Sequence, residues 1–468
     1  MTISEQPSAA ASRAGTWGEL LGREHLGAMV VLAGGVALYA INVYVTISLL
    51  PSAVADIGGE RLYAWNTTVY LLASVASAVL VGKLLAGSGS RQAYLIALGL
   101  FGIGTLICAA APTMPVLLLG RAMQGAGGGL LAGLGYALIR SALPAALWTK
   151  ASALVSAMWG VGTFVGPALG GAFAEFGSWR GAFISLMVAA ALVAVIVPRA
   201  LAGARAEAQA EPFPLVALLL LASAALVVSV ASVIATPLVS VLGVLAGLAL
   251  IAAFIGYERR ARVRVLPAAT FRGRSRLRWI YATIAVLSMS SMVEAFIPLF
   301  AQRLAGLAPL AAGFLGAALA LGWTSGELPS ASASRAVTIR RVIIAAPVVV
   351  GIGLVLAAVS MRADPGGWLL AVWVGAFLLI GAGTGIAWPH LSALAMSSVS
   401  DPLEGQKASA AINTVQLVAN AFGAALTGLA VNLGEPDTLL AAHYLFGSFA
   451  LLGVLGLVAA VLSQRGQD

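Results

Sequence analysis

The feature that most constrains this chain is a series of apolar runs of about 20 residues, separated by charged or Gly/Pro-rich breaks. Only 9% of the 468 side chains are charged and 60% are hydrophobic, whereas soluble domains carry about 25% charged residues. The chain lacks the polar surface that water requires, so its solvent must be lipid. This composition excludes a cytosolic enzyme, a nucleic-acid-binding protein and a disulfide-stabilised secreted domain.

Fourteen such runs are long enough to cross a bilayer. The sequence therefore predicts an all-α polytopic membrane protein with 14 transmembrane helices. Residues 1–25 carry several charges and no short apolar run before a cleavage site, so the first span is expected to be retained. The expected spans are 28–50, 64–86, 93–111, 114–139, 151–174, 181–199, 214–234, 237–257, 279–302, 308–330, 341–361, 367–396, 406–432 and 439–463.

Two polar segments divide the spans into two six-helix halves and a two-helix insert. A short repeat supports this division, because Gly82-Lys83-Leu84 and Gly326-Glu327-Leu328 each follow the second span of a half. Two matching halves are typical of secondary transporters with a central site. The expected regions are a cytoplasmic N-terminal tail (1–27), the N-terminal half (28–199), a linker (200–213), the insert (214–257), a basic cytoplasmic loop (258–278), the C-terminal half (279–463) and a C-terminal tail (464–468).

The distribution of positive charge predicts the orientation. With both termini in the cytoplasm, 21 of the 26 Lys and Arg residues lie in inner loops and tails and only four in outer loops. The net charge of +9 is thus explained by topology and by attraction to the anionic inner leaflet. We expect a multi-pass protein of the cell membrane with no nucleic-acid partner.

The fourth and fifth spans carry the most distinctive motifs. Arg121 places a permanent cation inside the membrane, where such a residue usually faces a cavity or an acidic partner. The alternative is an Arg121 side chain that extends to the outer headgroups. Glycines follow Gln124 along the same span. The fifth span combines small residues that permit close helix contact with a proline that removes a backbone hydrogen bond, namely Gly162, Gly166, Pro167, Gly170 and Gly171.

These motifs resemble those of the major facilitator superfamily. The resemblance rests on Arg121-x-x-Gln124-Gly-x-Gly, Gly166-Pro167-x-x-Gly170-Gly171, the segment from Trp65 to Tyr70 and the Trp179-Arg180 turn, and it covers nearly the whole chain. The fourteen-span layout is similar to the drug:proton antiporter branch. The resemblance implies export, with Arg121 taking part in proton coupling. It also implies that the fifth-span residues seal and flex the outward gate: Gly162, Gly166, Pro167, Gly170 and Gly171.

The chain departs from the family pattern at two acidic positions. In the loop after the second span, Gly82, Leu84, Gly89 and Arg91 match the pattern, but Ala86 replaces its aspartate, so the inner contact between the halves must be weaker or built differently. Asn42, nine residues before Pro51, stands where antiporters of the family often have an aspartate. An amide cannot carry a proton at physiological pH, so the usual coupling acid is missing.

Glu294 is the expected replacement. It lies about 15 residues from the inner end of its span, which places it about 22 Å into a core about 30 Å thick. Arg121 lies about 10 Å from the outer end of its own span, so the two depths agree within about 2 Å. We expect Glu294 to carry the proton and to approach Arg121 across the interface between the halves. The alternative is a carboxylate that bonds within its own helix or lines a wet outer vestibule.

Other polar residues within or next to spans have less specific interpretations. Glu327 is expected at an interface or loop contact near the inner membrane edge, and His390 in helix packing or at an inner gate. Asn413, Gln416 and Asn420 have helical spacing and either line the cavity or bond between helices. The residues expected to line the substrate cavity are Asn42, Trp65, Asn66, Tyr70, Gln124, Trp159, Phe296, Gln416 and Asn420.

The sequence therefore predicts a secondary active transporter, a proton-coupled exporter of amphipathic or cationic organic compounds. The chain has no Walker-type loop and only three scattered histidines, so we expect no enzyme activity, no cofactor and no metal site. Its partners are expected to be a small organic substrate, protons and the bilayer, and the protein is expected to be monomeric. The alternatives are an exporter of a specific metabolite or lipid, an uncoupled facilitator of the same fold, or a non-transporting membrane receptor or scaffold.

Overall fold

The computed structural model describes residues 16–201, 214–234, 236–272, 275–398 and 402–464. Most of the 200–213 linker, the first part of the 1–27 tail and residues 465–468 of the C-terminal tail lie outside these ranges. The described part is built of α-helices and short 3-10 turns. They are α1 (Trp17–Leu20), α2 (Arg23–Ile57), η1 (Glu60–Leu62), α3 (Trp65–Ala78), α4 (Val81–Ala110), α5 (Met114–Ala137), α6 (Ile139–Ala142), η2 (Ala145–Leu147), α7 (Trp148–Phe176), α8 (Trp179–Ala200), α9 (Leu215–Ile234), α10 (Pro237–Arg260), η3 (Ala268–Phe271), α11 (Leu277–Ser291), η4 (Met292–Phe296), α12 (Ile297–Ala305), α13 (Pro309–Ser330), α14 (Ala336–Ser360), α15 (Gly367–Ser397), α16 (Pro402–Gly434) and α17 (Thr438–Ser463).

The protein is an all-helical, multi-pass membrane protein. In the described ranges, 11 helical segments have the length and apolar composition needed to cross a bilayer. The remaining three predicted spans correspond to α3, α5 and α13. Helix α3 has only 14 residues, and glycines and polar residues lower the mean hydropathy of α5 and α13. The total of 14 spans therefore stays a prediction.

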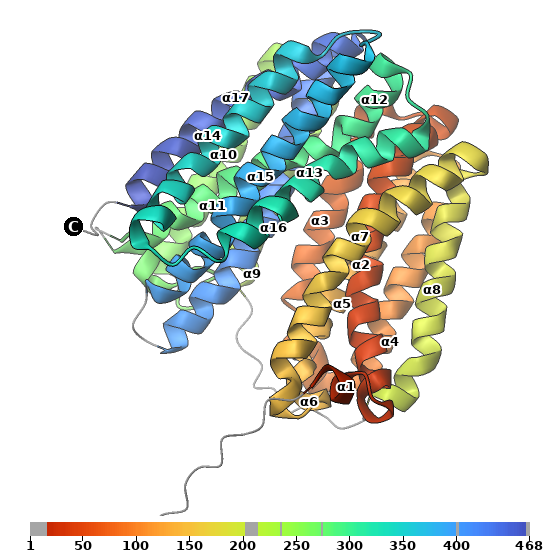
Figure 1. The fold of residues 1–468 in the computed structure, drawn as a ribbon, viewed down its shortest axis with the longest axis vertical. Coiled ribbons are helices and arrows are strands. Elements are labelled where there is room, and N and C mark those ends of the chain that lie inside the picture. The colour runs from red at the N-terminus through yellow and green to blue at the C-terminus, as the bar shows by residue number, and fades with distance from the viewer. Residues whose placement is uncertain (1–15, 202–213, 235, 273–274, 399–401, 465–468) are drawn as a thin grey trace, which may run out of the picture.

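The helices form two bundles that meet at one end of the molecule. Helices α2 to α8 and helices α11 to α17 come together at the end that carries η1 and α12, and they diverge toward the end that carries α1 and α6 (Figure 1). We call the first end the predicted outer face and the second the predicted inner face. Helix α7 packs against α13, and α3 packs against α16. The α9–α10 hairpin covers the second of these two seams, because α9 contacts both α3 and α16.

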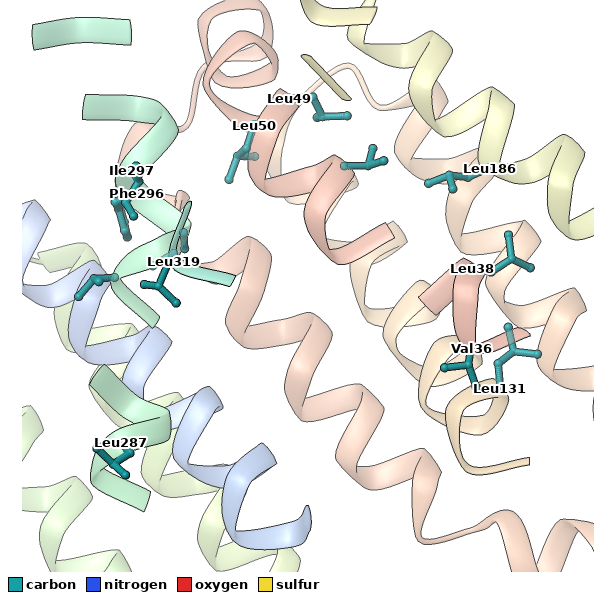
Figure 2. Close-up of a cluster of buried hydrophobic side chains, with 14 of the residues drawn as sticks. Val36, Leu38, Leu49, Leu50, Leu131, Leu186, Leu287, Phe296, Ile297 and Leu319 are labelled. Atoms are coloured by element: carbon teal, nitrogen blue, oxygen red, sulfur yellow. The ribbon is translucent and has the colours of Figure 1, made fainter. Parts of the chain in front are cut away.

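Apolar side chains fill the interior of each half, and glycines let the helices approach closely. A Cβ atom at Gly104 would lie 2.7 Å from the carbonyl oxygen of Gly120, so α4 and α5 are in backbone contact there. Figure 2 shows buried side chains of both halves, among them Val36, Leu38, Leu131 and Leu186 in the N-terminal half and Leu287, Phe296 and Leu319 in the C-terminal half.

The span over 277–305 is broken in the middle. Helix α11 ends at Ser291, the 3-10 turn η4 follows, and α12 begins at Ile297. Pro298 has no N–H group, so it cannot bond to the carbonyl of Glu294 one turn earlier. The Ile297 N–H bonds to that carbonyl instead, in the tighter 3-10 pattern. Glu294 therefore lies on a break inside a membrane helix, the type of segment that forms binding sites in transporters.

Candidate transport site and outer gate

The fifth-span motif packs α7 against α2. A Cβ atom at Gly162 would lie 2.8 Å from the Ala40 carbonyl carbon, and one at Gly170 would lie 2.5 Å from the Val45 carbonyl oxygen. A side chain at either position would collide with backbone, which cannot move aside as a flexible side chain can. These glycines therefore allow α7 and α2 to lie in direct backbone contact.

The same motif also contacts the C-terminal half. A Cβ atom at Gly171 would lie 2.6 Å from the Cα of Leu310, at the start of α13. The Leu310 N–H donates to the carboxylate of Glu175 at 3.1 Å. Gly313 of α13 packs against Ser48 of α2, and the Ser48 hydroxyl is 3.4 Å from the Pro167 carbonyl oxygen. These contacts join the halves along the α7/α13 seam at the predicted outer face.

A second set of contacts joins the η1 turn and Tyr63 of the N-terminal half to η4, α12 and α16 of the C-terminal half. The rings of Tyr63 and Phe296 have centroids 4.7 Å apart, and Glu60 of η1 forms an ion pair with Arg303 of α12. The amide of Asn432 donates to the Arg61 carbonyl at 2.9 Å. The hydrogen bonds that Leu310 and Asn432 donate to the other half both lie at this end. We call the two sets together the outer closure, and they close the molecule at the predicted outer face.

Below the outer closure, the N-terminal half contains a chain of aromatic side chains that ends on Arg121. The guanidinium lies over the Tyr70 ring at 4.0 Å, Tyr70 stacks on Tyr39 at 5.6 Å, and Tyr39 meets Trp159 edge-on at 5.5 Å. A Cβ atom at Gly128 would lie 2.7 Å from the Tyr39 ring and 2.9 Å from the Tyr70 oxygen. The glycine face of α5 therefore makes room for this pair of rings.

Several polar atoms around this chain of rings have no hydrogen-bond partner among the described residues. They are both amide atoms of Asn42, the Oδ1 atom of Asn66 and the Tyr70 hydroxyl. Asn42 is 0% exposed, and Asn66 and Tyr70 are each 1% exposed. A buried polar group without a partner is costly, and native structures usually supply one. These atoms therefore mark a polar site that the side chains of the protein leave unsatisfied.

Glu294 lies in the C-terminal half, where it faces the other half. Its side chain is 9% exposed, and its Oε1 atom has no partner in the described part of the chain. Tyr44 of α2 lies close enough to Glu294 to interact with it electrostatically across the interface. Glu294 is therefore a buried acid at the contact between the halves.

Comparisons with known proteins identify the family. Residues 32–424 match the family model described as Major Facilitator Superfamily. The chain belongs to the major facilitator superfamily. It is 51% identical over 458 residues to a Mycobacterium tuberculosis protein named "Probable multidrug-efflux transporter", covering 96% of this chain and 97% of the relative. It is 25% identical over 389 residues to "Multidrug resistance protein 3" of Bacillus subtilis, covering 79% of this chain and 73% of that protein.

Solved structures of major facilitator proteins have the same fold. A nucleoside transporter aligns with a TM-score of 0.66 at 13% identity, covering 93% of this chain and 100% of its own. A transporter of the POT family aligns with a TM-score of 0.67 at 13% identity, covering 93% of this chain and 96% of its own. Membership of this transporter family indicates a transporter and not an enzyme.

Within this major facilitator fold, the expected approach of Arg121 to Glu294 is absent. Arg121 donates to the Gln124 Oε1 atom at 2.8 Å and is 3.4 Å from the Asn66 carbonyl oxygen. No ion pair joins Arg121 to Glu294 in the described part of the chain. The position of a residue along a span determines its depth in the membrane, but not the direction in which its side chain points.

Three of the nine residues expected to line the cavity lie elsewhere. The Trp65 indole donates to the Ser229 carbonyl at 2.9 Å, so it connects α3 to helix α9 of the two-helix insert. Gln124 is buried between α4 and α5, where it donates to Thr105 at 2.8 Å. Phe296 belongs to the outer closure.

The other six residues lie closer to the expected cavity. Trp159 is 40% exposed and contacts Tyr39 at the end of the chain of rings. The other five are Asn42, Asn66 and Tyr70, around the chain of rings, and the half-buried Gln416 and Asn420 on α16.

The remaining polar residues mostly make contacts within one half. Arg91 donates to the Pro198 carbonyl at 2.6 Å and so ties α4 to α8, while Gly82 is exposed with open space around it. Glu327 accepts from the Trp323 indole at 2.8 Å. His390 lies 3.0 Å from the hydroxyl of Ser330, between α15 and α13. Asn413 is exposed on α16.

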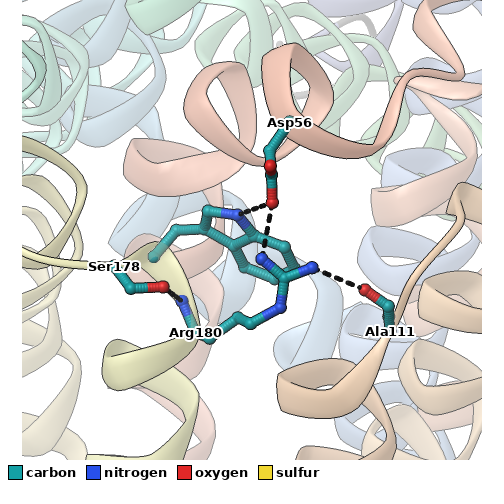
Figure 3. A network of polar contacts seen from close by, with 5 residues as sticks. Asp56, Ala111, Ser178 and Arg180 are labelled. Carbon is teal, nitrogen blue, oxygen red and sulfur yellow. Dashed lines mark hydrogen bonds and ion pairs between the residues drawn. The ribbon is translucent and has the colours of Figure 1, made fainter.

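Several residues of the outer closure and of the ring chain were not singled out by the sequence analysis. Tyr39 lies three residues before Asn42 on the same face of α2, and that spacing could have indicated it. No sequence signal indicated Tyr63 or Asn432. Figure 3 shows a further case, in which Asp56 accepts from both Trp179 and Arg180, and Arg180 also donates to the Ala111 carbonyl at 3.0 Å. The Trp179-Arg180 turn was recognised, but its partner at the end of α2 was not.

Proposed function

We propose that this protein is a secondary active exporter that couples the efflux of amphipathic or cationic organic compounds to proton entry. The observation that carries the proposal is the position of Glu294. It is a buried carboxyl group on a helix break at the contact between the halves, and it has no cationic partner in the described part of the chain. The "multidrug-efflux" name of the 51% identical relative supports export as the direction of transport.

The chemistry of a carboxyl group explains how Glu294 could couple the two movements. Burying a neutral carboxyl group at the interface costs far less than burying an unpaired carboxylate there. Opening of the outer closure would expose Glu294 to the outer solution, where it takes up a proton and the substrate leaves. Closure then requires the protonated form. The proton is released when the predicted inner face is open, and the site is ready for the next substrate.

The proposal includes the membrane arrangement. Fourteen spans, arranged as six, two and six, place both termini and the basic 258–278 segment in the cytoplasm of the cell. The boundaries of the regions are those expected from the sequence. The fifth-span glycines with Pro167 act as the moving part of the outer closure, and the transporter works as a monomer.

An uncoupled facilitator of the same fold is the second candidate. Asn42 favours it, because an amide stands on α2 where an acid would carry a proton. The two candidates differ in one property, since only an antiporter moves protons when substrate moves.

Purified protein in proteoliposomes tests the proposal. A panel of cationic and amphipathic dyes is first screened for efflux in cells that lack their own pumps, and the best dye is then added to liposomes that contain a pH-sensitive probe. We expect the dye to drive a counter-flow of protons, and an imposed pH gradient to concentrate the dye. Dye movement without any proton movement would favour the facilitator.

A further inference from the structure

The buried cation Arg121 has no counter-ion among the described residues. Its side chain is 2% exposed, and it forms no ion pair with any residue in the described ranges. The titratable groups near enough to interact with it are Tyr70, Cys108 and Tyr39, which are neutral in their ordinary state. A guanidinium inside a membrane protein is normally balanced by an acid or lies in a polar cavity.

The hydrogen-bonding capacity of Arg121 is also incompletely used. A guanidinium has five N–H groups. In the described part, one bonds to Gln124 at 2.8 Å and one lies 3.4 Å from the Asn66 carbonyl oxygen. Three N–H groups therefore have no acceptor from the protein there.

Two further donors without partners lie beside this cation. The Tyr70 ring is in contact with the guanidinium at 4.0 Å, and Asn42 lies close enough to the Tyr70 hydroxyl to interact with it. The Asn42 Nδ2 atom and the Tyr70 hydroxyl have no partner among the described residues. Asn42 is 0% exposed and Tyr70 is 1% exposed. The site thus combines one positive charge with N–H and O–H donors on buried side chains.

We propose that this site in the N-terminal half binds a monovalent anion, either a halide ion or the carboxylate group of an organic molecule, between Arg121, Asn42 and Tyr70. One negative charge balances the single positive charge, whereas a dianion would leave an uncompensated charge in the membrane interior. The burial of all three side chains restricts the ligand to a small ion or a single carboxylate group. This inference goes beyond efflux, because it concerns an ion that neither the proton nor a cationic substrate supplies.

The experiment measures binding on purified protein in lipid nanodiscs. The thermal unfolding midpoint is recorded in sodium gluconate, whose bulk keeps it out of an enclosed site, and again as gluconate is replaced by chloride or by acetate at constant ionic strength and pH. We expect the midpoint to rise by several degrees and to saturate, because a ligand that binds only the folded state stabilises it. A rise with chloride alone assigns a halide, and a rise with acetate assigns a carboxylate. No rise with either anion overturns the proposal.

Two variants connect the effect to the site. Asn42→Asp places a fixed carboxylate next to the Tyr70 hydroxyl, within the proposed anion site, so it should abolish the dependence on added anion. The same amide-to-carboxylate change at the exposed Gln92 of α4, Gln92→Glu, should leave it intact. Tyr70→Phe keeps the ring over Arg121 and removes one donor, so it should shift the titration to several-fold higher anion concentration even where Asn42→Asp fails to fold.

If both Asn42→Asp and Tyr70→Phe titrate as the wild-type protein does, the anion binds elsewhere and the proposal fails. Because no step of this measurement involves transport, its result is independent of whether the protein is an exporter.

Discussion

A single methyl group at Gly171 should open the outer closure. In the closed arrangement, the Cβ atom of an alanine at this position would lie 2.6 Å from the Leu310 Cα and 3.1 Å from the Pro309 carbonyl oxygen. Both are backbone atoms of the opposite half, so neither can rotate away. When the halves separate at this face, the same methyl group has nothing to strike. The substitution Gly171→Ala therefore destabilises the closed state selectively.

The expected magnitude follows from the cost of overpacking. One extra methyl group in a well-packed contact typically costs about 1–3 kcal/mol. The methyl group raises the free energy of the closed state and not that of the open state. The ratio of open to closed molecules should therefore rise by about 5- to 150-fold. Gly160→Ala is the matched control, since it is the same change on the same helix with nothing within 4 Å of its Cβ.

Cysteine labelling from outside the cell can measure this shift. Ser48 is itself part of the closed α7/α13 seam, where it is 1% exposed, so a Ser48→Cys reporter in a Cys108→Ser background, present in both proteins, should react with an impermeant maleimide only when the closure opens. We expect the Gly171→Ala protein to react at least five-fold faster than the Gly160→Ala protein, which is the lower end of the range. Equal labelling rates in the two proteins would refute the steric argument and the assignment of this face to the outside.

Three further predictions concern the gate, the topology and stability. Gly166→Leu and Gly170→Leu should abolish transport without preventing membrane insertion, because both side chains would collide with α2; efflux at matched expression tests this, and wild-type efflux would contradict it. In the Cys108→Ser background, Ser275→Cys should react only with reagents that reach the cytoplasm and Gly366→Cys with external ones; the reverse pattern would invert the orientation. Glu258→Ala should destabilise the protein by about 1–3 kcal/mol, measured by thermal unfolding in detergent, because its carboxylate accepts from the backbone N–H groups of Val265 and Leu266. Glu258→Gln keeps one acceptor oxygen and should lose less, and equal loss in both variants would contradict this explanation.

The helical membrane fold could be predicted because it depends on composition along the chain. Apolar length determines a span, so each of the fourteen expected spans corresponds to a helix or to a pair of helix segments. The glycine motif of α7 was informative for a similar reason, since a run of small residues allows backbone contact whatever lies opposite. Neither argument requires knowledge of a distant neighbour.

The partners of polar residues could not be predicted in this way. Gln124 follows Arg121 by three residues on one helix, and this local spacing was visible. Trp65, by contrast, bonds to Ser229, and Asn432 bonds to Arg61, contacts that join segments 164 and 371 residues apart. The direction of a side chain around its helix is decided by how the bundle packs, and a single sequence does not specify it. The expectation that Arg121 and Glu294 approach each other was wrong for this reason.

The central claim, that Glu294 carries the proton, is tested most directly by dye accumulation in proteoliposomes under an imposed pH gradient. Glu294→Gln mimics the permanently protonated state, so it should bind dye but lose accumulation against a gradient, while Glu294→Asp should keep partial activity with a shifted pH dependence. Glu327→Gln, the same change at an acid that bonds to Trp323 within its own helix, should accumulate dye as the wild-type protein does. If Glu294→Gln concentrates the dye as well as the wild-type protein does, then Glu294 is not the proton carrier.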